Sequence, residues 1–182
     1  MQGGRRNRQV NYTTEADVYL GLGANLGNRN SNLKAALERL RRLGSIQRVS
    51  SIYETQPVGQ EEQPLFLNMA CHMITRRTPH EVLETALLIE RELGRRRTTP
   101  HAPRQVDIDI LLYDDLVLSD SDLMIPHPRL DERAFVLVPL AEIAPDALDP
   151  RSGATIRRLL QRCGDTHWVR PYEGGEDVQT IR

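Results

Sequence analysis

The chain has 182 residues, a formal net charge of −1 and 39% hydrophobic residues, values typical of one domain with a sizeable core. The balanced charge gives no global signature for binding a polyanion, and no apolar run reaches the ~18 residues of a membrane-spanning helix. Cys71 and Cys163 lack metal-ligand spacing and predict reduced, buried thiols. Because the N-terminus lacks an apolar signal-peptide core, we expect a cytoplasmic protein. We also expect no membrane and no nucleic-acid partner.

The first half of the chain predicts a strand, a helix and two further strands. We expect residues 1–15 to form a disordered tail, residues 16–173 to form one domain, and residues 174–182 to form a frayed tail. The first strand is predicted at 18–23, and a helix at 29–43 with Gly44 as its C-terminal cap. Strands near 45–53 and 66–75 flank a loop at 56–64 that contains two prolines and Gly59.

The second half begins with a capping box in which Thr78 and Glu81 open a helix that Gly94 ends. A strand at 106–112 follows, the pair Asp114-Asp115 predicts a turn, and a further helix is expected near 155–163. The order β-α-β-β-α-β predicts an α+β fold, a ferredoxin-like sandwich with a C-terminal elaboration. Its two helices should cover one face of the sheet and leave the other face to loops and ligands.

The most informative segment joins an arginine-rich loop to two carboxylates on the strand at 106–112. Asp107 and Asp109 are separated by one residue, so on a strand they share a face while Val106, Ile108 and Ile110 point into the core. Neighbouring carboxylates raise each other's pKa unless a cation lies between them. Oxygen ligands beside arginines suit Mg²⁺ and phosphate, which indicates phosphoryl transfer. The four arginines are Arg95, Arg96, Arg97 and Arg104. The alternatives are a solvated strand edge and a solvated arginine face.

Five blocks, in order, give the chain a resemblance to a known family. They are VYLGLGANLG at 18–27, SIYETQPVG at 51–59 with QPLFLNMA at 63–70, PRQVDID at 103–109, IPHP at 125–128 and ERAF at 132–135. This series resembles the 6-hydroxymethyl-7,8-dihydropterin pyrophosphokinases of folate biosynthesis and covers about residues 17–145. The resemblance implies transfer of pyrophosphate from ATP to the hydroxymethyl group of the pterin, giving AMP. It also implies other enzymes of the folate pathway as candidate partners.

The resemblance implies roles around the phosphates. Asp107 and Asp109 match an acidic pair that binds two Mg²⁺ ions, and Arg104 matches an arginine that clamps phosphate. The remaining matches are Arg95 and Arg97, in an Arg-x-Arg of a loop that closes over substrates, and Glu90, His127 and Arg133 near ATP. Arg96 falls on a variable position and is expected to be solvated. Without the resemblance, His127 would be interpreted as a turn histidine and Arg133 as a surface helix residue.

The resemblance also implies a pterin pocket. Phe66 and Phe135 are the chain's two phenylalanines, and they match stacking aromatics, although ordinary core packing is the common role of phenylalanine. Asn68 shares a strand face with Phe66 and would bind the ring edge. The remaining matches are Thr55, Val58 and His101, the last at a position where the family often has tryptophan or asparagine.

Two loop segments differ from the patterns that they resemble. The glycine-rich stretch at 21–27 lacks the Lys-Ser/Thr of a phosphate-binding loop, so its glycines are interpreted as permitting a tight turn and close packing. Gln56 stands where the family frequently has proline, which predicts a less stiff loop. The alternative function is a ferredoxin-like module that binds nucleotides or RNA without chemistry, which would need exposed aromatics on a basic sheet.

Overall fold

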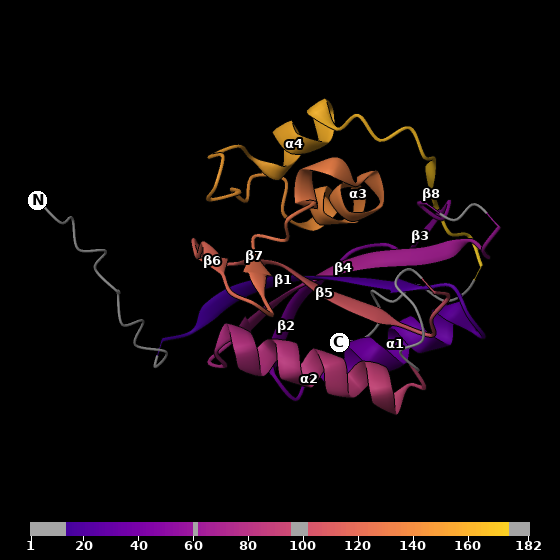
Figure 1. Cartoon of the computed structure of the whole chain (residues 1–182), viewed down its shortest axis with the longest axis horizontal. Helices are drawn as coiled ribbons and strands as arrows, with labels where there is room; N and C mark the ends of the chain where they lie inside the picture. Colours follow the sequence, from indigo (N-terminus) through magenta and orange to yellow (C-terminus); the bar gives the residue numbers. More distant parts are fainter. Residues whose placement is uncertain (1–13, 60–61, 96–101, 175–182) are drawn as a thin grey trace, which may run out of the picture.

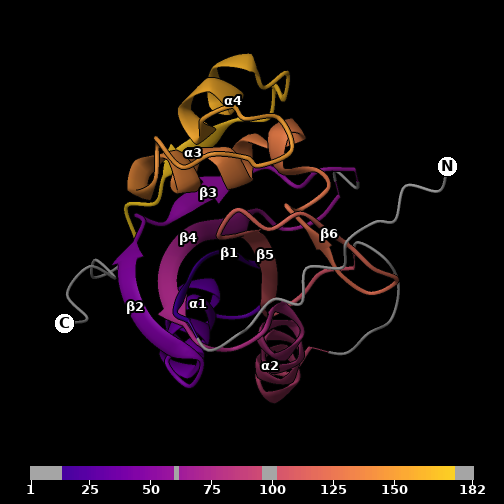
Figure 2. The same ribbon diagram turned by 90° about the vertical axis from the view of Figure 1, so that its left-hand side faces the viewer.

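The computed structural model describes residues 14–59, 62–95 and 102–174. In this part of the chain an antiparallel sheet lies between two pairs of helices (Figures 1 and 2). Helices α1 (Arg29–Leu40) and α2 (Pro79–Glu92) cover one face, and α3 (Ala134–Ile143) and α4 (Ile156–Arg162) lie on the other side. The fold is therefore a mixed α/β sandwich.

The sheet has β1 (Ala16–Ala24) and β4 (Phe66–Thr75) at its centre, with β5 (Asp107–Tyr113) beside β1. Strands β2 (Gly44–Val49) and β3 (Tyr53–Thr55) pair one after the other with the far edge of β4, and β8 (Val169–Pro171) pairs with β3. In this register Gly23 of β1 lies opposite Asn68 of β4 on one side and Asp107 of β5 on the other. The ends of three strands therefore meet where the site is formed.

Several expected boundaries are confirmed because local side chains determine them. In the capping box at α2, Glu81 N donates to Thr78 Oγ1 at 3.2 Å and Thr78 N donates to Glu81 Oε2 at 2.7 Å. Gly94 follows the helix with φ of 93°, a conformation that favours glycine. Asp114 turns the chain after β5 with φ of 44°. Thr155 caps α4, which confirms the expected C-terminal helix.

Two predictions about the first half were wrong. The strand expected at 45–53 is two strands, β2 and β3, interrupted between Val49 and Tyr53. Gly44 does not cap the preceding helix, which ends at Leu40, but begins β2. A Cβ at Gly44 would lie 2.1 Å from the carbonyl oxygen of Ile74, so glycine is needed there for the close approach of two strands.

The expectation that the second sheet face is left to loops was wrong. Helix α3 packs on this face of β4, and its apolar residues form a second core with α4; that core contains Leu111, Leu130, Leu137, Leu140 and Ile156. The segment before α3 adds the short strands β6 (Leu118–Ser119) and β7 (Met124–Ile125) and the 3₁₀ helix η1 (Leu130–Glu132). Cys71 is fully buried as expected, whereas Cys163 is half-buried. None of the helices in the described ranges is long and apolar enough to cross a membrane.

Candidate active site

Strand β5 places the two carboxylates on the sheet face that looks toward α3. Val106, Ile108 and Ile110 point to the opposite side and are at most 5% exposed in the core beneath α1 and α2. Asp107 and Asp109 therefore share a face, as their spacing predicted, and both line a pocket between the sheet and α3.

Asp107 is the centre of an ion-pair network. Arg95 Nη1 lies 2.6 Å from Asp107 Oδ1, and Arg104 Nη1 lies 2.8 Å from Asp107 Oδ2. Arg95 also contacts Glu90, whose carboxylate is buried on α2 and accepts a hydrogen bond from Ile108 N at 2.8 Å. Burial raises the pKa of Glu90. Glu90 thus binds both Arg95 and the backbone at the start of β5. It is not among the residues that line the pocket.

Asp109 has the more perturbed carboxyl group. Burial, and next the negative charge of Asp107, raise its pKa to about 7. Arg133 and Arg104 oppose this shift without cancelling it. A carboxylate whose charge is this unfavourable gains more from a cation than an exposed one would. The pair therefore suits a divalent ion, in agreement with its donor chemistry.

Arg104 is fixed by its backbone as well as by its side chain. Asn25 Oδ1 accepts from Arg104 N at 2.8 Å, while Asn25 N and Leu26 N donate to Arg104 O at 3.1 and 3.2 Å. Asn25 Nδ2 reaches Gln63 Oε1 at 3.2 Å, so this buried asparagine also joins the loop before β4 to the arginine segment. The glycine-rich stretch at 21–27 therefore orders the site through Asn25. Its Gly27 has φ of 63°, as expected for a tight turn.

The other end of the pocket is lined by aromatic, apolar and polar residues. Phe66 and Phe135 both line it and are partly exposed, which distinguishes them from ordinary core phenylalanines. Asn68 is 6% exposed, and its Nδ2 donates to Thr55 Oγ1 at 2.7 Å. A Cβ at Gly23 would lie 2.7 Å from Asn68 Oδ1, so the missing side chain at Gly23 makes room for the amide. This edge offers polar groups beside aromatic faces.

The turn before α3 supplies the remaining charged groups. The Arg133 guanidinium carbon lies 5.6 Å from the centre of the Phe135 ring. Nε of Arg133 and Nε of Arg104 are both buried and lack a hydrogen-bond partner within the described residues. A buried guanidinium donor without a partner costs free energy, so both groups suit an anionic ligand in the pocket.

His127 lies beside this pocket and outside its lining. His127 N donates to Leu111 O at 3.0 Å, and Arg129 N donates to His127 Nδ1 at 3.1 Å. Burial, and next the charge of Arg133, lower the pKa of His127 to about 4. The ring is therefore neutral near pH 7. Because Nδ1 accepts a hydrogen bond, the ring proton resides on Nε2, which can donate.

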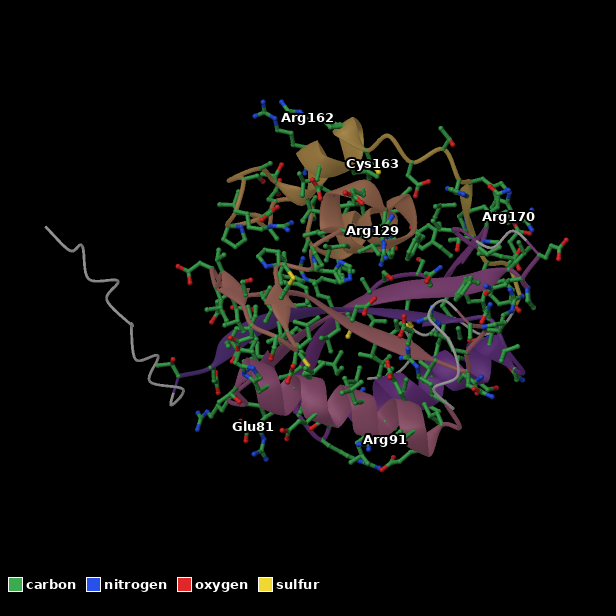
Figure 3. The ribbon with its side chains drawn as sticks, in the orientation of Figure 1. Glu81, Arg91, Arg129, Arg162, Cys163 and Arg170 are labelled. Carbon is green, nitrogen blue, oxygen red and sulfur yellow. The ribbon has the colours of Figure 1, made fainter. Side chains whose placement is uncertain are left out.

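The structure brings together most of the residues that the sequence predicted for the site. Nine of them line the one pocket: Thr55, Val58, Phe66, Asn68, Arg104, Asp107, Asp109, Arg133 and Phe135. Arg96, Arg97 and His101 lie outside the described residues. Sequence reasoning missed four polar residues, Asn25, Gln56, Gln63 and Arg129, of which the last three line the pocket. In the view of Figure 3, Arg129 is labelled at α3. Arg129 and Arg133 flank η1 and are four residues apart, and this spacing was the available signal.

The comparisons with known proteins agree with this geometry. A family model described as 7,8-dihydro-6-hydroxymethylpterin-pyrophosphokinase (HPPK) matches residues 19–145. A 2-amino-4-hydroxy-6-hydroxymethyldihydropteridine pyrophosphokinase of Methylorubrum extorquens is 46% identical over 147 residues, which is 80% of this chain and 92% of that protein.

Two longer proteins match over part of their length. The mitochondrial folate synthesis bifunctional protein of Arabidopsis thaliana is 44% identical over 167 residues. The match covers 91% of this chain but 30% of that protein, so the chain spans less than a third of the length of this relative. The fold resembles that of a wild-type HPPK-DHPS crystal structure from Plasmodium falciparum, with a TM-score of 0.66 and 17% identity over 82% of this chain and 45% of that one. The family-model match and the Methylorubrum relative show that the chain belongs to the 7,8-dihydro-6-hydroxymethylpterin-pyrophosphokinase family.

Proposed function

We propose that the chain transfers the pyrophosphoryl group of ATP to the hydroxymethyl group of 6-hydroxymethyl-7,8-dihydropterin, in tetrahydrofolate biosynthesis. The pterin hydroxyl oxygen bonds to the β-phosphorus of ATP and loses its proton, and the bond from that phosphorus to the α-phosphate oxygen breaks, releasing AMP. One observation carries the proposal: a single pocket joins an aromatic and amide end at Phe66 and Asn68 to a carboxylate and guanidinium end at Asp109 and Arg104.

The aromatic end fits a pterin. A flat heterocycle can stack between Phe66 and Phe135, with Asn68 and Thr55 facing its polar edge. Val58 lines the same end of the pocket. Asn68 already donates a hydrogen bond to Thr55 in the free protein. Binding of the pterin would therefore cost little additional side-chain entropy at these two residues.

The charged end fits a triphosphate with Mg²⁺. Asp107 and Asp109 would hold the ions, two by resemblance to the family, and when bound the ions neutralise and polarise the phosphates. Arg104 and Arg133 would bind phosphate through donors now without partners, and His127 would donate from Nε2.

Arg95 and Glu90 would support the phosphate site by holding Asp107 and the start of β5 in place. Arg95 neutralises Asp107 and Glu90 together, so it keeps the start of β5 in place in the free protein. We assign Arg97, Arg95 and Arg104 to the catalytic arginine loop, and His101 to the pterin side of that loop, from the family resemblance of the segment.

We also propose that the core of the fold is ferredoxin-like, and that it serves the transferase and not a module that binds nucleotides or RNA without chemistry. The order β5-β1-β4 followed by β2 and β3, all antiparallel with α1 and α2 on one face, is what a ferredoxin-like βαββαβ core requires. An RNA-binding module on this plan would need an open sheet face. In the described chain α3 packs against β4 on that face, which argues against this alternative.

Two further aspects are proposed from the relatives. One relative is named a folate synthesis bifunctional protein and one fold neighbour is described as HPPK-DHPS, which supports an association of this chain with other enzymes of folate synthesis. We place the chain in the cytoplasm, because its two cysteines are free thiols, which are typical of a reducing compartment.

The test is a product assay. The purified chain is incubated with ATP, Mg²⁺ and the hydroxymethyl-dihydropterin, and the nucleotide products are separated by chromatography. AMP and pterin pyrophosphate should form in equal amounts, and both should vanish without Mg²⁺ or without pterin. ADP as the product, or AMP formation that is independent of pterin, would refute the proposal.

A further inference from the structure

The segment from Asp165 to Tyr172 connects the two walls of the pocket, although it lies outside residues 19–145 that match the family. We call residues 165–172 the C-terminal strap. It runs from the end of α4 down to the edge of the sheet, where β8 pairs with β3 (Figure 1), and Figure 3 shows Arg170 at that edge. One end of the strap contacts α3 and the other contacts β3, so it joins the layers that enclose the pocket.

The first contact is at the beginning of α3. Asp165 Oδ2 accepts a hydrogen bond from Ala134 N at 2.9 Å, and its side chain is 7% exposed. Asp165 Oδ1 accepts from His167 N at 3.0 Å, which fixes the carboxylate. A carboxylate at a helix N-terminus satisfies free N–H groups and complements the helix dipole. Ala134 lies between Arg133 and Phe135, so Asp165 holds the backbone that carries both pocket residues.

The second contact is at the opposite wall. Trp168 N donates to Gln56 Oε1 at 3.0 Å, and Gln56 lines the pocket directly after β3. Val169 pairs with Thr55, whose hydroxyl accepts from Asn68. We expected the loop at Gln56 to be less stiff than one with proline at this position. That expectation did not include the hydrogen bond from Trp168 N to Gln56, which connects the loop to the strap.

The strap is itself held at the sheet edge. Arg170 pairs with Glu54 and its guanidinium lies 4.5 Å from the centre of the Trp168 ring. Arg29 binds the other oxygen of Glu54 at 3.0 Å and the carbonyl of Leu65, beside Phe66, at 2.8 Å. Tyr172 N donates to Ile52 O at 2.9 Å. These contacts anchor the part of the strap that follows Trp168.

We propose that Asp165 and Gln56 are positioning residues for the pterin pocket, through which the C-terminal strap sets the spacing of its two walls. Gln56 acts on the β3 wall that carries Thr55, and Asp165 acts on the α3 wall that carries Arg133 and Phe135. The inference rests on the proposed function, because it concerns how tightly the pocket holds the pterin and ATP.

The experiment compares Gln56→Ala and Asp165→Ala in the full chain with two control variants. Gln47→Ala removes an exposed glutamine of β2 that binds Ser45, and Asp146→Ala removes a carboxylate that is 81% exposed. Calorimetry measures the Kd of the pterin and of a nonhydrolysable ATP analogue with Mg²⁺, well below the melting temperature of each variant. Steady-state assays measure KM and kcat.

Gln56→Ala should raise the Kd of the pterin about tenfold, the scale of one lost hydrogen bond, and change that of the ATP analogue less. Asp165→Ala should weaken both ligands, because α3 carries residues of both halves of the site. Asp165→Asn keeps one of the two acceptor oxygens and should recover part of the loss, through the bond to Ala134 N. In each case KM should rise more than kcat falls.

The outcomes separate the two proposals. If the wild type forms AMP and binds the pterin but both variants match their controls in Kd, or merely melt earlier, the strap proposal is wrong and the proposed function stands. If the wild type neither binds the pterin nor forms AMP, the proposed function fails and the positioning role fails with it.

Discussion

Arg104 and Asp107, three residues apart, form a direct ion pair in which Arg104 Nη1 lies 2.8 Å from Asp107 Oδ2. Arg95 holds the other oxygen of the same carboxylate at 2.6 Å. In the free protein these arginines therefore neutralise the acid that is proposed to bind Mg²⁺. A triphosphate with its ions would offer the arginines and the carboxylate new partners at once, so binding exchanges charge pairs and leaves none uncompensated.

Replacing either acid should abolish most of the activity. We expect Asp107→Asn and Asp109→Asn to lower kcat by about 10²-fold or more, the scale observed when one preorganised electrostatic group is removed. Both variants should keep the native circular dichroism spectrum, because neither side chain lies in the core. Near-normal turnover in both variants would refute the metal assignment.

The same substitutions should have opposite effects on stability. The pKa of Asp109 is about 7 in the folded chain and 3.8 in the reference state, so the folded chain binds more protons between these values. Its stability must then fall as the pH rises through this window. Asp109→Asn removes this cost, and we expect a melting temperature above that of the wild type at pH 8, by roughly 2–4 °C for each ~1 kcal/mol gained.

At pH 5 the Asp109 carboxyl is protonated in the wild type, so the difference should shrink there. Asp107→Asn is the matched comparison, since it leaves Arg95 and Arg104 without their shared carboxylate and should melt below the wild type at pH 8. Thermal melting of the three proteins from pH 5 to pH 8, without ligands, measures both effects. A constant difference between Asp109→Asn and the wild type across this range would contradict the pKa assigned to Asp109.

Local sequence determined much of the fold and of the site. The strand at 66–75 and the helix opened by Thr78 were predicted with accurate bounds. For the helix the reason is local, because a capping box and a glycine each act over a few residues. No range was predicted for helix α3, because its sequence is almost entirely apolar, with Pro139 inside, and shows no amphipathic pattern. Its burial between the sheet and α4 is a tertiary property.

The same distinction applies to the site. Asp107, Asp109 and Arg104 lie within six residues and were visible as a motif. Asn25 and Asp165 were not, because each acts on a backbone group that is distant in sequence, 79 residues away at Arg104 and 31 residues away at Ala134. A sequence pattern contains no information on such contacts until the strands are paired.

Two substitutions should damage pterin binding and leave ATP binding nearly unchanged. Phe66→Ala removes one stacking face, at a cost of about 1–3 kcal/mol by analogy with stacking of nucleobases on aromatic side chains. Asn68→Ala leaves the ring edge and the Thr55 hydroxyl without a partner, at a similar cost of roughly 1–3 kcal/mol. Calorimetry with each ligand separately tests this, and equal losses for both ligands would show that these residues support the fold and not the pocket.

Gly23 provides a test that leaves every polar side chain of the site in place. The Cβ of an alanine at position 23 would lie 2.7 Å from Asn68 Oδ1, so Asn68 must move and its bond to Thr55 must be distorted. We therefore expect Gly23→Ala to weaken pterin binding by about tenfold or more, consistent with the loss of one or two hydrogen bonds, with a smaller change for the ATP analogue. Gly21→Ala is the comparison, because its Cβ would meet the Leu111 side chain at 3.4 Å, an ordinary contact, and should cost less. If the two alanine variants bind the pterin equally well, Asn68 is not held in the orientation that the pocket requires.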